Sequence, residues 1–282
     1  MGDHAVVIGG GVAGLLAARV AADFYSSVTV LDRDVLPDAA APRKAVPQGH
    51  HIHALLARGQ QILEALFPGF TDELAGLGVP IGDFGTSLSW YVDGAMLQKA
   101  KTELVCVAAG RPLLERHIRA RLLDLPNVRI RQATEVTTLL GNAGGNRVTG
   151  VRLYDKSATA AQQDLAADLV IEAAGRGSRL TRWLEELGYP CVTEQTVKMD
   201  LTYTTCDFHL TPEFDPIGND IALIPVATPA NPRGAIFARL PDRYAISLTG
   251  ILGDRPGKDF ESFLNFVQSL PVPEILSVGD DG

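Results

Sequence analysis

In the first 32 residues, the pattern of apolar and polar positions shows two short apolar runs that flank a glycine-rich turn and a longer helical segment. Residues 5–8 (AVVI) are wholly apolar, as expected of a parallel strand covered on both faces. A GGGVAG turn follows, and residues 12–24 carry helix-forming leucine and alanine. Residues 28–31 form a second apolar run, which Asp32 closes. This order predicts a strand, a turn, a helix, a second strand and an acid.

The glycine turn satisfies the pattern G-x-G-x-x-G, which is typical of dinucleotide sites. The first glycine permits the tight turn, the second lets the main chain approach a pyrophosphate, and the third lets helix and strand pack closely. The acid stands 18 positions after the last glycine, where an acid binds a ribose hydroxyl. A glycine-rich turn in an ordinary α/β protein is the alternative. The predicted contacts are Gly9, Gly11, Val12, Ala13, Gly14 and Asp32.

A long loop separates this unit from the next predicted helix. Residues 33–49 hold three prolines and show no periodicity. A simple NAD domain usually has a short connection at this point, so the loop favours FAD. Apolar residues at helical spacing then predict a helix that starts near His50 and continues through residue 67.

At this loop the chain resembles the FAD-dependent monooxygenases of the para-hydroxybenzoate hydroxylase type. That family follows the ribose acid with a long loop carrying arginine, then a Gln-Gly turn into a helix beside the flavin. Arg43 and the VPQG turn with Gln48 match this pattern. The resemblance implies that Arg43 faces the adenosine or pyrophosphate end of FAD and that the turn lies near the isoalloxazine ring. Arg33 joins the same predicted cofactor set, because guanidinium groups suit a diphosphate.

Three histidines, His50, His51 and His53, lie at the start of the predicted helix. A metal site would need further ligands, but no Cys, Asp or Glu occurs in the next ten residues, and we expect no metal. Solvent exposure or local hydrogen bonds are the alternatives. Contact of His50 or His53 with the flavin edge is a third.

Two later segments extend the resemblance. Residues 103–130 predict strand, turn, helix, turn and strand, and Arg111 falls where the family has an arginine that reaches towards the ribityl chain. An ordinary surface cation is its alternative. Residues 128–140, 147–154 and 164–167 predict three strands, the first two separated by GNAGGN. Such a β-meander is usual in the flavoprotein version of the fold.

Residues 169–187 predict a buried strand, a tight turn and a helix. In aromatic hydroxylases this turn carries Asp-Gly and is linked to FAD and NADPH contact. Here Arg176 and Gly177 stand in its place, so the predicted contacts are Gly175 and Arg176. A cation beside a pyrophosphate is electrostatically sensible, whereas a plain turn residue is the alternative.

From residue 190 onward, short strands separated by turn residues predict an antiparallel sheet, to which residues 87–99 contribute an earlier hairpin. In the family, such a sheet covers the flavin and forms the substrate pocket. Residues 258–270 predict an amphipathic helix. The apolar face expected for it consists of Phe260, Phe263, Leu264 and Val267.

The sequence therefore predicts an α/β fold with a Rossmann-like FAD-binding domain of the glutathione reductase type, with a β-meander, plus a smaller antiparallel-sheet substrate domain. Residues 1–80 and 104–189 are assigned to the first, and residues 81–103 and 190–282 to the second. The family's later Gly-Asp fingerprint is missing, because SVGDDG at residues 277–282 lacks the strand before it and the helix after it. We expect a truncated copy, or one whose carboxyl-terminal part is supplied elsewhere.

Composition limits the partners. The 282 residues include 33 acidic and 25 basic side chains, a net charge of -8, which argues against a nucleic-acid partner. Three widely spaced cysteines fit neither a disulfide framework nor a zinc site and suggest a cytoplasmic setting. The apolar run at residues 5–22 is broken by glycines and lacks a signal-peptide pattern, so we expect neither secretion nor stable membrane insertion.

The leading hypothesis is an FAD-dependent oxidoreductase, an NAD(P)H-using monooxygenase that hydroxylates or epoxidises a small organic substrate, with NADPH or NADH as reductant. One alternative is a flavin-dependent reductase of the geranylgeranyl reductase type. Another is a truncated, non-catalytic nucleotide-binding protein. A flavin halogenase is disfavoured, because that family's Trp-x-Trp-x-Ile-Pro signature is absent. No catalytic acid or base is named by the sequence.

Overall fold

The computed structural model describes residues 2–156, 162–209, 215, 217–241 and 243–272. The chain forms two compact units, each built from two stretches of sequence: Met1–Pro47 with Pro112–Thr196, and Gln48–Arg111 with Val197–Gly282. Residues 48–80 and 104–111, which the sequence analysis placed in the FAD-binding domain, therefore pack with the second unit. Packing does not test which residues bind a cofactor, so the functional domains stay a prediction.

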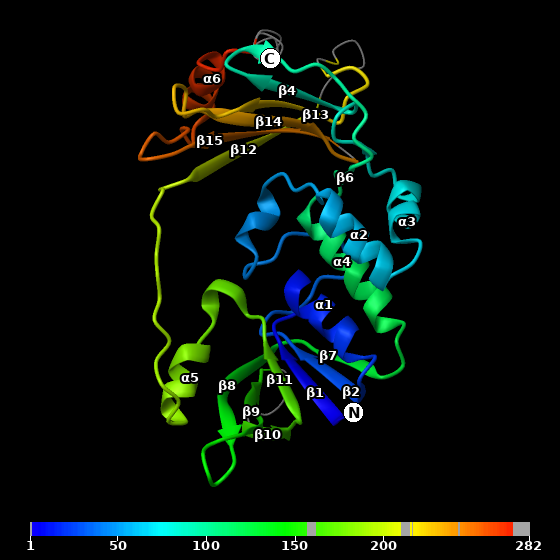
Figure 1. Cartoon of the computed structure of the whole chain (residues 1–282), viewed down its shortest axis with the longest axis vertical. Helices are drawn as coiled ribbons and strands as arrows, with labels where there is room; N and C mark the ends of the chain where they lie inside the picture. Colours follow the sequence, from blue (N-terminus) through cyan, green and yellow to red (C-terminus); the bar gives the residue numbers. More distant parts are fainter. Residues whose placement is uncertain (1, 157–161, 210–214, 216, 242, 273–282) are drawn as a thin grey trace. The chain divides into compact units, whose positions relative to one another are not determined.

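The first unit is centred on a four-stranded parallel sheet (Figure 1). Its first strand lies inside the sheet and is fully buried from Ala5 to Ile8, because both of its faces are covered. The predicted parallel βαβ unit is thus confirmed. In spatial order the strands are β11 (Leu169–Glu172), β1 (Gly2–Ile8), β2 (Tyr25–Leu31) and β7 (Val128–Arg131).

Different layers cover the two faces of this sheet. Helix α1 (Val12–Ala21) packs on the face that carries Val7, whereas Val6 and Ile8 on the other face pack against a three-stranded antiparallel meander. Because side chains alternate along β1, the strand contributes to two apolar cores, one under α1 and one under the meander. This layered arrangement confirms the predicted fold class with its meander. The remaining elements are β8 (Thr134–Gly141), β9 (Val148–Asp155), β10 (Gln162–Ala166), α4 (Arg111–Leu123), the 3₁₀ turn η2 (Gly175–Gly177) and α5 (Leu180–Glu186).

The second unit is built on a six-stranded sheet (Figure 1). Most neighbouring strands are antiparallel, as predicted, but β13 and β4 run parallel. The residues between them fold elsewhere, which leaves room for a crossover connection. In spatial order the strands are β12 (Thr202–Phe208), β15 (Tyr244–Gly250), β14 (Gly234–Arg239), β13 (Ala222–Val226), β4 (Leu88–Val92) and β5 (Ala95–Met96).

Each face of the six-stranded sheet has its own apolar cluster. Helix α6 (Phe260–Gln268) packs on one face and buries Phe263, Phe266 and Val267. A second cluster, which includes Leu88, Cys106 and Ala238, occupies the other face. The smaller elements of the unit are the 3₁₀ turn η1 (Pro47–His50), α2 (Ala57–Leu66), α3 (Phe70–Gly76), β3 (Ile81–Asp83) and β6 (Val105–Val107).

Two predicted boundaries are wrong. The helix expected from about His50 starts at Ala57, because Leu55 instead exchanges backbone hydrogen bonds with Val107 at 2.8 and 3.2 Å. The strand expected over residues 128–140 is two strands, since Ala133 adopts a positive φ of 52° between β7 and β8 and the chain changes sheets there.

Two predictions about burial are also wrong. Strand β11 was expected to be buried, but it lies at the edge of the parallel sheet and is partly exposed, with Leu169 at 36%. Phe260 was assigned to the apolar face of α6, yet it is 57% exposed and Phe266 takes its place in the core. The helix begins at Phe260, so its first side chain lies beyond the edge of the cluster.

Among the residues that the structure describes, no helix combines the length and apolarity that a membrane crossing requires. Cys106, Cys191 and Cys206 are free thiols. Burial raises the pKa of Cys106 to about 11, so this thiol is protonated at neutral pH. The SVGDDG segment lies outside the described residues.

Candidate functional site

The turn between β1 and α1 presents main chain without side chains. Gly9 has a φ of +104°, and a Cβ there would lie 2.5 Å from the carbonyl oxygen of Ala173. A Cβ at Gly14 would lie 1.8 Å from the carbonyl oxygen of Gly9 and 3.3 Å from Val7. The tight turn and the close helix packing expected of the first and third glycines are therefore both present.

Helix α1 begins directly after this turn, with Gly11 as its N-cap residue in an extended conformation. Gly11 has no side chain that could cap the helix, so the first N–H groups of α1 are left to water or to a ligand. Val12 is half-buried and Ala13 is exposed in this first turn. A helix N-terminus of this kind attracts anions, and phosphate is the anion that the glycine pattern predicts.

Asp32, at the end of β2, is hydrogen-bonded to the glycine turn. Its side chain is buried, Oδ2 accepts the Gly10 N–H at 2.7 Å, and Oδ1 accepts the Asp34 N–H at 2.8 Å. A carboxylate has about four lone-pair sites. Asp32 thus retains acceptor capacity for a hydroxyl group while its bond to Gly10 fixes its position beside the turn.

Arg43 lies among three carboxylates, which we call the Arg43 cluster: Arg43, Asp32, Asp34 and Glu115. Its Nε donates to Glu115 at 2.7 Å, and its Nη1 lies 3.2 Å from Asp34 and 3.4 Å from Asp32. The Arg43 side chain is 8% exposed. Burial lowers the pKa of Arg43, but the nearby negative charges outweigh this effect and raise its pKa overall. The guanidinium therefore holds the predicted ribose acid, and its contact with FAD stays a prediction.

The turn after β11 lies beside the residue that follows Asp32. A Cβ at Gly177 would come within 3.4 Å of Nη1 of Arg33, and both Arg33 and Arg176 are exposed. Gly175 has a φ of +65°, which favours glycine at this turn. Strands β1, β2 and β11 run parallel, so their carboxyl ends lie at the same end of the sheet. The glycine turn, Arg33 and η2 follow these strand ends and therefore lie there together.

Two predicted cofactor residues belong to the second unit. Gln48 is exposed within η1, and Arg111 is the half-buried first residue of α4. The N–H of Gly110, next to Arg111, donates to the His53 carbonyl at 3.3 Å, which joins the two segments inside this unit. The FAD contacts of both residues remain predictions.

His51 and His53 make different contacts, and His50 is exposed. His51 Nδ1 lies 2.8 Å from Thr205 Oγ1, which lies 2.8 Å from the buried Ser247 Oγ. His53 bonds locally to the carbonyl oxygen of His51 at 3.1 Å. Burial lowers the pKa of His53, an effect that its hydrogen bond to the His51 carbonyl opposes and the nearby charge of Arg111 adds to. Within the described ranges, no group of three or more His, Cys, Asp or Glu side chains is arranged to hold a metal ion.

Sequence analysis missed Gly10, Asp34 and Glu115. Asp34 stands two positions after Asp32, and this short spacing between two acids could have indicated that Asp34 also belongs to the site. Glu115 is an acid inside the otherwise basic helix segment RPLLERHIRAR, and it is buried. A buried acid needs a partner, but nothing in the sequence names Arg43, which stands 72 positions earlier.

Comparison with known proteins gives one sequence relative and many similar structures. No family model matches the chain. Protein Rv3254 of Mycobacterium tuberculosis (strain ATCC 25618 / H37Rv) is 41% identical over 219 residues, which make up 74% of this chain and 45% of that protein. The chain thus spans less than half the length of this relative.

The similar structures have low sequence identity to this chain and include flavin-dependent enzymes. Pseudomonas aeruginosa PqsL, in complex with 2-aminobenzoylacetate, has a TM-score of 0.69 at 16% identity, covering 99% of this chain and 70% of that one. The p-nitrophenol 4-monooxygenase PnpA of Pseudomonas putida DLL-E4 has a TM-score of 0.63 at 17% identity, with 92% and 59% covered. The myxobacterial FAD-dependent halogenase CndH has 0.64 at 18%, with 96% and 58% covered. The chain therefore has the fold shared by FAD-dependent monooxygenases and halogenases.

Proposed function

We propose that this chain is an FAD-dependent oxidoreductase, a monooxygenase that uses NADPH or NADH and acts on a small organic substrate. The observation that carries the proposal is the turn of bare main chain between β1 and α1, whose Gly10 N–H is bonded to Asp32 at 2.7 Å. The turn offers N–H groups to a diphosphate, and Asp32 offers an acceptor to a ribose hydroxyl. The fold shared with flavin-dependent monooxygenases supports FAD over NAD.

In this proposal the residues of the first unit bind and orient the cofactor. The turn and the N-terminus of α1 contact the diphosphate, and Asp32 contacts the adenosine ribose. Arg33, Gly175 and Arg176 lie beside this site, at the carboxyl end of the parallel strands. When bound, FAD supplies the redox chemistry, with a nicotinamide as electron donor and O₂ as the source of oxygen. The chain itself supplies position, electrostatics and exclusion of water. This explains why a monooxygenase needs no triad or paired carboxylates.

Flavin binding is the direct test. The purified chain is incubated with FAD and desalted, and its visible spectrum is recorded. We expect bound flavin in the wild type and none in Gly11→Val, because a side chain at this position blocks the approach of the pyrophosphate to the main chain. Gly76→Val is the matched control, since nothing lies within 4 Å of a Cβ at Gly76, in α3. A chain that takes up no FAD, or a Gly11→Val variant with unchanged flavin content, contradicts the proposal.

The class of reaction is tested by oxygen consumption. A monooxygenase consumes O₂ when NADPH or NADH is supplied together with substrate, whereas a reductase of the geranylgeranyl reductase type oxidises the nicotinamide without consuming O₂ stoichiometrically. Flavin binding without oxygen consumption would therefore retain the cofactor assignment and refute the monooxygenase. The two experiments therefore test the flavin-binding site and the monooxygenase reaction independently.

Removal of the ribose acid gives a graded prediction. We expect Asp32→Ala to weaken FAD binding by about 1–3 kcal/mol, because it removes a charge-assisted hydrogen bond and the anchor of the Gly10 N–H. Asp23→Ala is the control: its side chain is 57% exposed at the other end of α1. Isothermal titration of both variants with FAD measures the effect, and equal Kd values would remove Asp32 from its proposed role.

A further inference from the structure

A cavity of about 340 Å³ lies in the second unit, beside strand β4. This volume is at the lower end of the roughly 300–1,000 Å³ typical of small-molecule sites. We propose that this cavity binds an uncharged aromatic or similarly apolar small molecule. The inference concerns the second unit alone and does not rest on the function proposed above. The cavity is lined by Phe84, Gly85, Leu88, Trp90, Leu97, Gln98, Lys99, Ala100 and Thr102.

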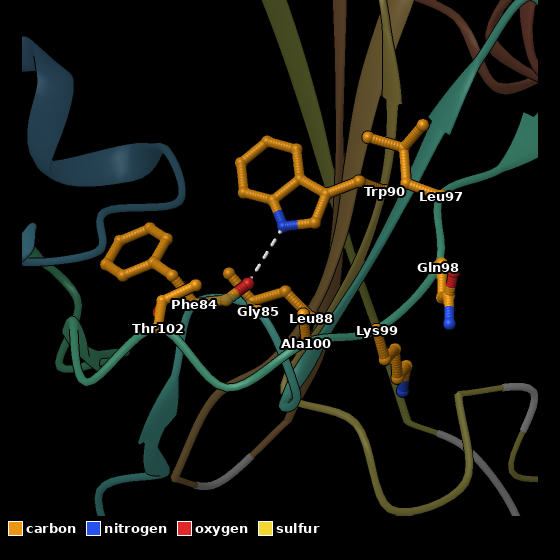
Figure 2. A pocket seen from close by; sticks show the side chains of 9 residues that line it. All are labelled: Phe84, Gly85, Leu88, Trp90, Leu97, Gln98, Lys99, Ala100 and Thr102. Atoms are coloured by element: carbon orange, nitrogen blue, oxygen red, sulfur yellow. Dashed lines mark hydrogen bonds between the residues drawn. The ribbon is translucent and has the colours of Figure 1, made fainter.

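The walls of the cavity are apolar and include two aromatic rings. Figure 2 shows the rings of Phe84 and Trp90 among the lining side chains, with Leu88 and Leu97 from the same stretch of chain, and both rings pack against the cluster that contains Leu88. Leu88 is buried, and the indole N–H of Trp90 donates to the Phe84 carbonyl at 3.0 Å. This bond satisfies the one polar group of the ring and fixes its orientation. The indole therefore contributes only its apolar surface to a ligand.

Hydrogen bonds hold the two segments that border the cavity. Asp83 Oδ1 accepts the Gly85 N–H at 2.8 Å and the Thr102 hydroxyl at 3.0 Å. A Cβ at Gly85 would lie 1.9 Å from the carbonyl oxygen of Ala100, so the segments pass each other in close contact. The Thr102 hydroxyl, like the Trp90 N–H, is thus already paired. The cavity is preformed, and a ligand need not order it.

Charge decides the class of ligand. Lys99 is the one ionisable residue of the lining, and its Nζ lies 2.5 Å from Asp220 Oδ1. The other oxygen of Asp220 accepts the Ser89 hydroxyl at 2.5 Å. In Figure 2 the polar ends of Gln98 and Lys99 point away from the two rings. An anionic ligand would lose hydration here without gaining a free counter-charge, so an uncharged one is favoured.

A pair of fluorescent probes tests this. N-phenyl-1-naphthylamine is uncharged, and 8-anilinonaphthalene-1-sulfonate carries the same ring system with a sulfonate. Trp183→Phe leaves Trp90 as the single tryptophan, because the chain has two. We expect saturable energy transfer from Trp90 to the amine, with a Kd at least about tenfold lower than for the sulfonate, because burial of the charge is unfavourable. No saturable transfer, or equal affinities, overturns the proposal.

A matched pair of variants tests the location. Leu97 lines the cavity and is 50% exposed, whereas its neighbour Met96 is 55% exposed and does not line it. The backbone bond from the Leu97 N–H to Trp90 at 2.8 Å needs neither side chain. Leu97→Asp should raise the Kd of the amine at least about tenfold, and Met96→Asp should leave it unchanged. Equal effects of the two variants would refute this location.

A third variant tests the charge argument without blocking the cavity. Asp220→Asn removes the counter-charge of Lys99, so the sulfonate should now bind at least about tenfold more tightly than to the parent. An unchanged preference for the amine would refute the role of the Lys99–Asp220 pair.

The titrations are run with and without FAD. Since no predicted cofactor residue lines the cavity, amine binding by a chain that takes up no FAD supports this inference and refutes only the proposed function.

Discussion

Gly14→Ala is expected to destabilise the first unit by at least about 3 kcal/mol, even though alanine is normally the better helix former by about 1 kcal/mol. The reason is steric. The added Cβ would lie 1.8 Å from the carbonyl oxygen of Gly9, which is main chain and has no rotamer to adopt. Helix α1 must therefore move away from β1. The movement would also displace the N–H groups that the proposed diphosphate contacts use.

Trp183 gives this prediction its measurement. It is buried in the cluster that contains Val6 and Ile8 of β1, so its fluorescence reports on the first unit. In a Trp90→Phe background, urea unfolding followed by Trp183 should show a lower midpoint for Gly14→Ala. Gly144→Ala, in the same unit, is the control, because the nearest atom to a Cβ there lies at 3.6 Å, an ordinary van der Waals distance, and it should be neutral or slightly stabilising. Equal midpoints for the two variants would show that α1 does not pack as described.

The elements that local sequence determines could be predicted. Strand β1, the glycine turn, α1 and β2 follow one another within the first 31 residues, and each is indicated by its own apolar pattern or by its glycines. The parallel arrangement follows as well, because a helix between two strands enforces a crossover. The positions of Gly9, Gly14 and Asp32 in the candidate site could be predicted for the same reason.

What depends on distant partners could not be predicted. Leu55 has a helical pattern around it, yet its backbone pairs with Val107 and delays α2 to Ala57. The pattern of apolar and polar side chains shows whether a segment is amphipathic. It does not show which other segment of the chain will pair with its backbone. The exposure of β11 could not be predicted for a similar reason, since a mostly apolar run does not show whether its strand lies inside a sheet or at the edge.

The Arg43 cluster is a further case. The family resemblance implies a contact between Arg43 and the cofactor and names no protein partner for this side chain. The structure gives it Glu115 from α4 and two acids from the segment after β2. A positively charged loop residue and a buried acid were both visible in the sequence, but their pairing depends on how α4 lies beside the loop. Arg43 is thus a positioning residue for Asp32 in addition to its predicted contact with FAD.

Arg43→Met is the test of this positioning role. We expect it to destabilise the first unit by about 3–5 kcal/mol, because it leaves Asp32, Asp34 and Glu115 without their shared cation in a buried setting. Methionine keeps much of the apolar length of the side chain, so the loss is mainly one of charge and hydrogen bonds. The stability of Arg43→Lys should lie between that of the wild type and that of Arg43→Met, since an ammonium keeps the charge but loses the planar fork.

Two further variants separate the cluster from a general loss of positive charge. Lys44→Met removes an adjacent, exposed cation and should change the unfolding free energy by no more than about 0.5 kcal/mol. Adding Glu115→Gln to Arg43→Met removes one of the uncompensated carboxylates, so the double variant should be more stable than the single one if the two side chains are coupled. Urea unfolding monitored by Trp183 measures the parent, these four variants and the single variant Glu115→Gln, which the test of additivity requires. Strictly additive effects, or equal losses in Arg43→Met and Lys44→Met, would show that Arg43 does not hold these carboxylates in the folded protein.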